Sequence, residues 1–421
     1  MLNQNKKDLI FFYLLVLILP TQLGKHFWPQ FSFINGLRID YLSPTLYLTD
    51  IVILLIFIFS IKELLVKIQK KYFSVFLLFI SLLLTGILIS KNPGAGIYGL
   101  IKFLEFSFLF VYISLRKSEI RESLIVFLVS LSVIYESLIS IFQYFNSGSL
   151  NGIFYFFGER FYNAQTPGIA NVSINGELFL RPYGTFSHPN VLAAFLVLYM
   201  SVIMFFLLRK AKGFLKVFLI ATIILGTTSL LFTFSRTGIL SWVLVLFLSF
   251  ANAFLKKYKN FTRNFSLFVL LFISLLMIFY FPLSQRIFNF NLTDQSITQR
   301  ETLINESFKM ISNYPLLGVG VNNFLNNLHN NSLPYLLQPV HNIYLLVFAE
   351  TGILGFLFLI LFILILLKKI YIHHSFESLV ILMVILLMSS FDHYFLTIQQ
   401  GQILFAFFLG LIYSGVVVLK N

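Results

Sequence analysis

The sequence predicts an all-α polytopic membrane protein with about twelve transmembrane helices and two longer extracytoplasmic loops. Of its 421 residues, 58% are hydrophobic and 11% are charged, whereas soluble globular chains carry roughly 25% charged residues. Long apolar runs such as 214–232 lack the alternation of polar and apolar residues that a membrane-barrel strand shows. Because a helix satisfies its own backbone hydrogen bonds in lipid, these runs are expected to be helical.

Each predicted span follows from length and hydropathy, since crossing a hydrocarbon core about 30 Å thick takes about 20 mostly apolar residues. The chain divides into 1–145 with helices 1–5, 146–187 as a first extracytoplasmic loop, 188–282 with helices 6–9, 283–340 as a large extracytoplasmic loop, and 341–421 with helices 10–12. The individual spans are expected at 9–23, 46–66, 73–90, 97–115, 123–145, 189–208, 214–232, 237–254, 264–282, 342–367, 377–391 and 401–419.

The distribution of lysine and arginine predicts the orientation. Most of the 30 basic residues fall in alternate loops, which the positive-inside rule assigns to the cytoplasm. Both termini are therefore expected to be cytoplasmic, and the net charge of +14 is explained by membrane anchoring rather than by nucleic-acid binding. The first apolar segment follows Lys6 and Lys7, and no small-residue cleavage site comes after Pro20, so we expect the segment to be retained.

Composition also limits the chemistry. The chain has no cysteine, which excludes disulfides, thiol catalysis and thiolate metal sites. The predicted external loops contain no closely paired acidic motif and no His/Asp/Glu cluster with metal-ligand spacing. The sequence therefore predicts no metal and no cofactor.

The large external loop contains one predicted amphipathic helix, from Thr298 to about residue 313. Thr298 and Glu301 form a capping-box pattern at its start. At 100° per residue, Arg300 falls on one stripe with Ile304, Ser307 and Ile311, so Arg300 is expected to point toward the membrane. The alternative is an arginine that only snorkels to lipid headgroups.

Further basic side chains lie on the predicted external side, where topology does not require them. Guanidinium groups there suit a phosphate or pyrophosphate, which arginine binds in bidentate fashion. Arg236 stands at the start of the eighth span, where free N–H groups would add to anion binding, unless it only anchors the turn. The external set also includes Arg160, Arg181, Arg286, His188, His329, His341 and His393.

His341 and Asn342 open the tenth span after Pro339. An imidazole with an ordinary pKa near 6.5 suits a general base, although a histidine at a helix start is more often a structural residue. Glu350 lies roughly 180° around the same helix and about 13 Å away along it, so it is not expected to orient His341. We expect Glu350 to pack beside Gly352 and Gly355 inside the bundle.

Ionisable residues within the predicted spans suggest a competing function, the passage of a proton or ion. They are Asp50, Lys102, Glu105, Glu136 and Asp392. Lys102 and Glu105 stand at i and i+3 and can neutralise one another. The acids are scattered, and the sequence shows no broken helices in matching halves of the chain, as inverted-repeat transporters have.

Three stretches resemble the bacterial O-antigen ligases and the related O-antigen polymerases. They are TFSRTGILSWVL from Thr233, QRETLINESFKMISNYPLLGVGVNNF from Gln299 and HNIYLLVFAETGILGFLFLI from His341. RPYGTFSHPNVLAAF from Arg181 is similar to the segment that opens a span in these proteins, whereas the first 145 residues match in hydropathy and topology only. An aromatic residue that many members carry after the arginine equivalent to Arg300 is replaced here by Leu303 or Ile304.

The resemblance implies a GT-C-type glycosyltransferase of the bacterial cytoplasmic membrane, active at its outer face. Its donor would be a glycan on polyprenyl (undecaprenyl) pyrophosphate, and its acceptor a glycan, a lipid such as the lipopolysaccharide core, or a protein. It further implies that Arg236 and Arg300 bind the pyrophosphate, that Arg181 assists, and that His341 activates the acceptor hydroxyl. Asn342, Glu350 and His188 are candidates for supporting roles.

The mechanism expected from this site is inverting and independent of metal, because the arginines would stabilise the departing pyrophosphate. Paired carboxylates of the glycosidase kind are absent from the predicted external loops, which agrees with direct displacement. Three alternatives remain: a polymerase that extends the glycan on its carrier, a relative that glycosylates protein hydroxyls, and a transporter or flippase of lipid-linked sugars.

Overall fold

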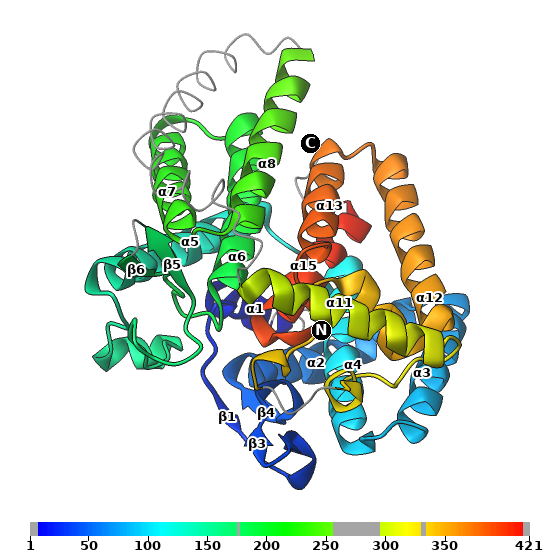
Figure 1. Cartoon of the computed structure of the whole chain (residues 1–421). Helices are drawn as coiled ribbons and strands as arrows, with labels where there is room; N and C mark the ends of the chain where they lie inside the picture. The colour runs from blue at the N-terminus through cyan, green and yellow to red at the C-terminus, as the bar shows by residue number, and fades with distance from the viewer. Residues whose placement is uncertain (1–6, 175–176, 256–294, 330–333, 416–421) are drawn as a thin grey trace.

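The computed structural model is predominantly helical and describes residues 7–174, 177–255, 295–329 and 334–415. The longer helices form a bundle, and α11 (Gln295–Asn313) lies across its front in the view of Figure 1. The other helices are α1 (Lys7–Ile18), α2 (Leu48–Lys67), α3 (Lys70–Leu88), α4 (Pro93–Leu115), α5 (Glu122–Asn146), α6 (Pro189–Arg209), α7 (Gly213–Phe232), α8 (Arg236–Leu255), α12 (Ile343–His373), α13 (Phe376–Ser389), α14 (Tyr394–Thr397) and α15 (Gln399–Ser414).

Five of the described helices are long and apolar enough to cross a membrane, as expected for a multi-pass membrane protein. They are α4, α5, α6, α7 and α12. The predicted number of about twelve spans stays a prediction, and the ninth, at 264–282, lies outside the described residues. The first predicted span, 9–23, is helical only to Ile18, because Pro20 disfavours the helical conformation of the preceding Leu19 and has no backbone N–H to continue the helix.

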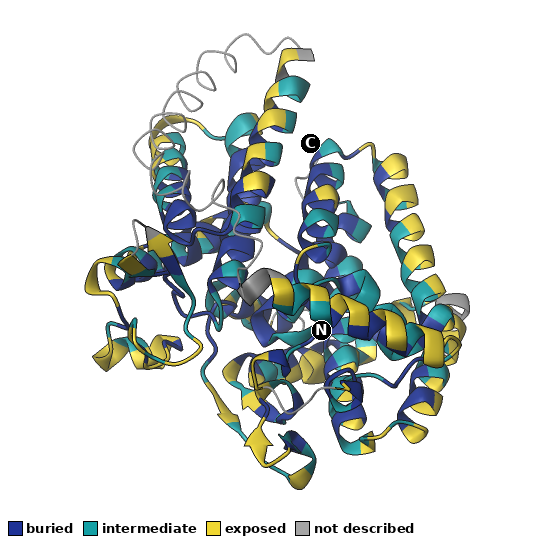
Figure 2. Ribbon diagram, in the orientation of Figure 1, coloured by how far each residue is buried: buried dark blue, intermediate teal, exposed yellow. Residues whose placement is uncertain are grey.

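Helix α6 forms the centre of the bundle. Its residues from Val191 to Phe206 are all buried, whereas α12 exposes much of one side, as the dark and yellow ribbons of Figure 2 show. A helix that is apolar all round is expected only where neighbours surround it. Close contacts at small residues support this packing, since a Cβ added to Gly238 in α8 would lie 2.7 Å from the Cβ of Ala193 in α6.

Ion pairs gather at one end of the bundle, among residues of the predicted cytoplasmic loops. Arg116 after α4 lies 3.0 Å from Asp8 in α1 and 2.8 Å from Glu63 in α2. Arg209 at the end of α6 lies 2.6 Å from Glu377 at the start of α13. These helix ends therefore face the same side, as expected for helices that cross a bilayer in alternating directions.

Two connecting segments contain small hairpins. Before α2, strand β1 (Gly24–His26) pairs with β4 (Thr45–Tyr47), and β2 (Phe33–Ile34) pairs with β3 (Leu37–Arg38). The loop that follows α5 has β5 (Asn171–Ile174) paired with β6 (Glu177–Leu180). The second segment lies in the predicted external loop 146–187, whereas the hairpins before α2 fall in a connection for which the sequence predicts no strand.

Candidate active site

The candidate site lies at the end of the bundle opposite the ion pairs, where three histidines converge from separate elements. His188 caps the start of α6, His341 directly precedes α12, and His393 lies between α13 and α14. The rings of His341 and His393 meet edge to face with centroids 5.0 Å apart. His341 and His188 are partly exposed and His393 is buried, and of the two accessible imidazoles His341 is the one that lies against His393 and Asp392.

Asp392 is the acidic partner of these histidines. A carboxylate oxygen of Asp392 and one ring nitrogen from each of His341 and His393 all lie within 4.8 Å of one another. Oδ2 of Asp392 accepts a hydrogen bond of 2.9 Å from the side-chain amide of Asn190, and Oδ1 accepts one of 2.8 Å from the backbone N–H of His393. These bonds fix the carboxylate beside His341.

The surroundings keep the histidines neutral and Asp392 ionised at neutral pH. Burial lowers the pKa of His393 to about 3, although Asp392 opposes the shift. Burial likewise lowers the pKa of His341, where Asp392 raises it and Arg300 lowers it further. For Asp392, burial alone would raise the pKa, but its histidine neighbours and the bond from Asn190 hold it at about 2. The site therefore combines a neutral imidazole with a carboxylate, as a general base and its partner require.

Arg181 connects this cluster to the turn between α7 and α8. Its Nε donates a hydrogen bond of 2.7 Å to the carbonyl of Thr233, and one NH2 group donates a bond of 2.8 Å to Asn190 Oδ1. Arg181 is buried, so these bonds replace those that water would make. Asn190 thus links Arg181, through its side-chain oxygen, to Asp392, through its side-chain nitrogen.

The turn that follows Thr233 begins α8 at Arg236, as expected. Phe234 has a φ of +49°, which reverses the chain direction between the two helices. The hydroxyl of Ser235 accepts a hydrogen bond of 3.3 Å from the N–H of Gly238 and so caps α8. Arg236 is therefore held at the first turn of α8, on the turn that Arg181 binds.

Arg300 reaches the site from α11. It lies close enough for its charge to lower the pKa of His188, His341 and His393. The buried residues of α11 are Leu303, Glu306, Ser307 and Met310, Arg300 is partly exposed, and Ile304 is exposed. Ser307 is on the buried face as predicted, but the prediction for Ile304 is wrong, because α11 packs on a neighbouring core through Leu303 and Met310.

Two of the candidate supporting residues occupy different places. The side chain of Asn342 caps α12 through a bond of 3.0 Å from the N–H of Leu345 and donates another of 3.0 Å to the carbonyl of Ser390, which fixes the start of α12 against the end of α13. Glu350 does not join the histidines and instead accepts a hydrogen bond from the N–H of Phe324.

The same cluster has the composition of a metal site. His341, Asp392 and His393 each offer one ligand atom in a compact group. The sequence showed no metal-ligand spacing because the three residues come from the starts and ends of different helices. A partly exposed His341 beside a carboxylate serves equally as a base without any ion, and addition or removal of metal distinguishes the two.

Comparison with known proteins gives a match to part of the chain that includes His341. Residues 221–360 match the family model described as O-antigen ligase. This part of the chain is therefore similar to the O-antigen ligase family. This O-antigen ligase domain contains Arg236, Arg300, His341 and Glu350, and it supports a function of the O-antigen ligase or polymerase type. No curated protein sequence matches the chain.

Sequence reasoning missed part of this site. Asp392 was grouped with scattered intramembrane acids, His393 received no role, and Asn190 was not considered. One signal was present, since Asp392 and His393 form a polar pair directly after the apolar residues of α13. Their proximity to His341 depends on the packing of α6, α12 and α13, which a linear pattern does not encode.

Proposed function

We propose that this protein is a membrane glycosyltransferase that moves a glycan from a polyprenyl pyrophosphate carrier to an acceptor hydroxyl at the outer face of the bacterial cytoplasmic membrane. One observation carries the proposal: within an O-antigen ligase domain, a neutral His341 lies beside an ionised Asp392 and in electrostatic reach of Arg300. Charge stabilisation and removal of one proton are what this transfer requires, since pyrophosphate is already a good leaving group.

In the proposed reaction, His341 removes the proton of the acceptor hydroxyl as that oxygen attacks the anomeric carbon. The bond from the anomeric carbon to the pyrophosphate oxygen breaks, and the electron pair leaves with the carrier. Arg236 and Arg300 stabilise the negative charge that grows on the pyrophosphate. The displacement inverts the anomeric centre and needs neither a covalent glycosyl-enzyme nor a metal.

Asp392 stabilises the imidazolium that His341 becomes, in the way that the aspartate of a catalytic triad supports its histidine. We assign Arg181 a bracing role instead of direct contact with pyrophosphate, because its hydrogen bonds to Thr233 and Asn190 connect the turn bearing Arg236 to Asp392. This arrangement ties the expected anion-binding and base functions into one network.

The transporter alternative is less well supported, because the acids on which it depends have local partners. Lys102 lies 2.7 Å from Asp50 and 3.0 Å from Glu105. Glu136 accepts hydrogen bonds from both the N–H and the hydroxyl of Thr185. These contacts fix α4 to α2 and α5 to the segment before α6, and they account for the acids without a transport path.

The experiment that tests the proposal uses the purified full chain with lipid-linked glycan and a set of acceptors. Candidate acceptors are the lipopolysaccharide core, a second lipid-linked glycan and a hydroxyl-bearing peptide, and the product mass tells ligase, polymerase and protein glycosylation apart. We expect release of polyprenyl pyrophosphate at the same rate with and without EDTA. Release that stops in EDTA and returns with a divalent cation would assign the histidine cluster to a metal instead.

A further inference from the structure

Helix α12 is interrupted at Gly352, whose φ of +63° and ψ of −169° are not helical. The part after the break, 353–373, is about 31 Å long and can cross a hydrocarbon core alone. The break therefore lies near the end of the span, between the membrane part of α12 and the short part that begins just after His341. An interrupted helix leaves backbone groups that need other partners.

The segment 315–324, which follows α11, supplies these partners. The N–H of Ile353 donates a hydrogen bond of 2.8 Å to the carbonyl of Pro315, and the N–H groups of Val319 and Gly320 donate bonds of 2.9 Å to the carbonyls of Ala349 and Glu350. The two backbones approach so closely that glycine is required. A Cβ on Gly318 would lie 2.4 Å from the carbonyl carbon of Glu350, and one on Gly352 would lie 2.3 Å from Leu316.

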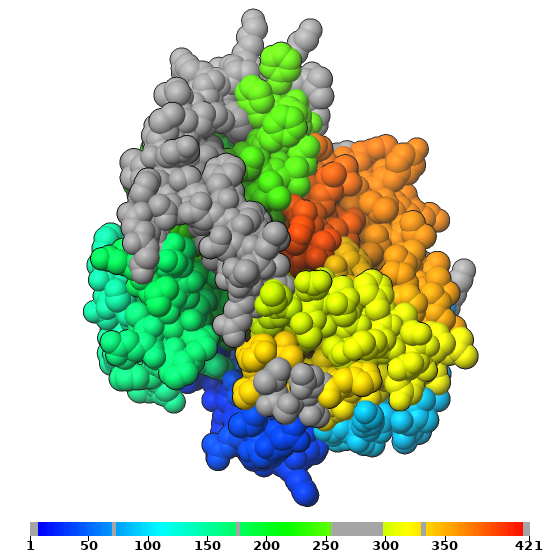
Figure 3. All heavy atoms as spheres, viewed as in Figure 1, coloured from blue at the N-terminus to red at the C-terminus, as the bar shows by residue number. Residues whose placement is uncertain are grey.

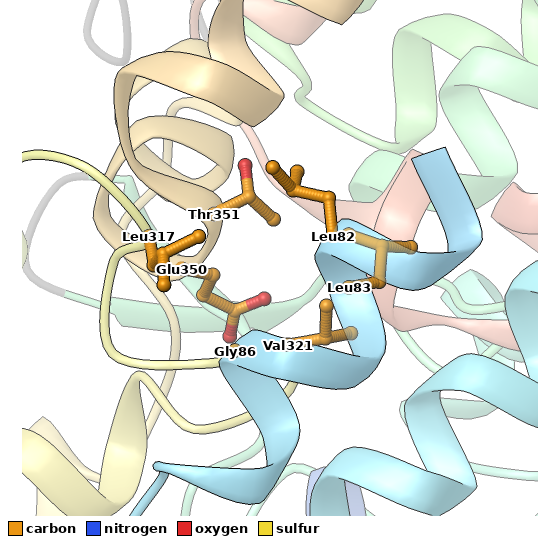
Figure 4. A pocket seen from close by; sticks show the side chains of 7 residues that line it. All are labelled: Leu82, Leu83, Gly86, Leu317, Val321, Glu350 and Thr351. Atoms are coloured by element: carbon orange, nitrogen blue, oxygen red, sulfur yellow. The ribbon is translucent and has the colours of Figure 1, made fainter. Parts of the chain in front are cut away.

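The side chain of Glu350 strengthens this junction. Its Oε1 accepts a hydrogen bond of 3.2 Å from the N–H of Phe324, and the N–H groups of Asn322 and Asn323 bond to the same carboxylate. Figure 4 shows the carboxylate between α12, the segment and α3, in a small cavity that Leu83 and Val321 also line. One acidic side chain thus binds three consecutive amides of the segment.

We propose that Glu350 is a positioning residue that holds the segment 315–324 in the break of α12 and thereby places Arg300 opposite His341. The inference rests on the proposed function. Helix α11 leads directly into Pro315, and its buried residues Leu303 and Met310 share a core with Val319, Phe324 and the first part of α12. In Figure 3, α11 (yellow) lies on the surface below α8 (green) and α13 (orange-red).

The position of Arg300 depends on the orientation of α11 at this junction. Arg300 stands 13 residues before the end of α11 at Asn313, which is about 20 Å along the helix. A small tilt at the junction therefore moves the guanidinium of Arg300 by a larger distance. A displacement of about 1 Å at a reacting group can lower a rate by about 100-fold.

The absence of cysteine from the chain allows a direct test with Leu316→Cys/Leu354→Cys. Both leucines are exposed, and a backbone hydrogen bond of 3.5 Å joins them, which suits the span of a disulfide. We expect Glu350→Ala to lower kcat by about tenfold to 100-fold and to raise the KM of the donor but not of the acceptor. Oxidation of the cysteine pair in the Glu350→Ala background should restore the rate, and reduction should abolish it again.

Wild-type kinetics in Glu350→Ala, or an oxidised pair that leaves Glu350→Ala as slow as the reduced form, would overturn the inference. If Glu350→Ala does not fold, Glu350→Gln keeps one acceptor oxygen and is expected to show the same effects at smaller size. If the wild type transfers no glycan, the proposed function fails, and the rate of disulfide formation still tests the junction. We expect Glu350→Ala to slow disulfide formation between the two introduced cysteines. Glu136→Gln changes a buried acid in α5 and should leave that rate unchanged.

Discussion

A carboxylate oxygen of Asp392 lies within 4.8 Å of a ring nitrogen of His341, although the two residues belong to connections at the ends of different helices. The pair joins a neutral imidazole to a fixed negative charge at the end of the bundle where Arg300 also acts. Because Asp392 raises the pKa of His341 and Arg300 lowers it, substitutions at these two residues should shift the pH–rate profile in opposite directions.

His341→Ala is expected to lower transfer by about 100-fold to 10,000-fold, the usual contribution of a general base. Binding of the lipid-linked donor should change little, since the arginines remain. The rate of polyprenyl pyrophosphate release and donor binding to the purified variant measure the two effects. His329→Ala is the matched control, because His329 is largely exposed and pairs with Glu306. A similar loss in both variants would count against a catalytic role for His341.

Asp392→Asn is expected to reduce kcat and to move the acidic limb of the pH–rate profile to lower pH. Asp392 raises the pKa of His341, so removal of its charge lowers that pKa further. The base then stays neutral to lower pH, but the imidazolium formed during transfer loses its stabilising charge. A full profile of kcat against pH checks both effects, and a limb that moves upward contradicts the proposed pairing.

Arg300→Gln should move the same limb in the opposite direction. Arg300 lowers the pKa of His341, so its removal raises that pKa and His341 becomes protonated at higher pH. The KM of the donor should rise because one pyrophosphate ligand is lost. Arg236→Ala is a useful comparison, since Arg300 is the arginine whose charge lowers the pKa of His341. It should raise the KM of the donor and leave the limb in place; equal shifts in both variants would disprove the distinction.

Arg181→Ala is expected to destabilise the protein as well as slow it. The substitution leaves the buried carbonyl of Thr233 and the amide of Asn190 without their charged donor, at a cost of about 1–3 kcal/mol. A lower Tm of the purified protein is the measurement. Arg160→Ala, which removes an exposed guanidinium 3.7 Å from Asp40, should leave Tm nearly unchanged. An unchanged Tm in Arg181→Ala would remove the bracing role.

The individual helices could be predicted well because hydropathy reports directly on contact with lipid. Residues 189–208 and 214–232 agree within one residue with α6 (Pro189–Arg209) and α7 (Gly213–Phe232). The hairpins before α2 could not be predicted, since their strands are only two or three residues long and lack a period. The break at Gly352 also gave no signal, because the surrounding residues are apolar and the groups that fill the break come from 315–324.

The residues of the candidate site also include some that the sequence could predict and some that it could not. His341, Arg236 and Arg300 were proposed from local patterns and from the family resemblance, and in the structure the charge of Arg300 acts on His341. Asp392 and Asn190 were not found, because their roles arise when the start of α6 packs against the end of α13. Residues far apart in sequence come into contact only in the folded bundle. The pattern of charge or hydropathy along the chain does not predict such contacts.

The central claim is that His341 activates the acceptor in a reaction at the pyrophosphate of a lipid-linked glycan. The most direct measurement follows release of free polyprenyl pyrophosphate from the glycan-bearing carrier, with purified wild type beside His341→Ala, in the presence of acceptor and EDTA. If His341 is the base, the wild type releases polyprenyl pyrophosphate and forms a glycosylated product, and His341→Ala does neither. Equal release by the two proteins, or no release with any acceptor while the wild type moves the carrier across a liposome membrane, would contradict it.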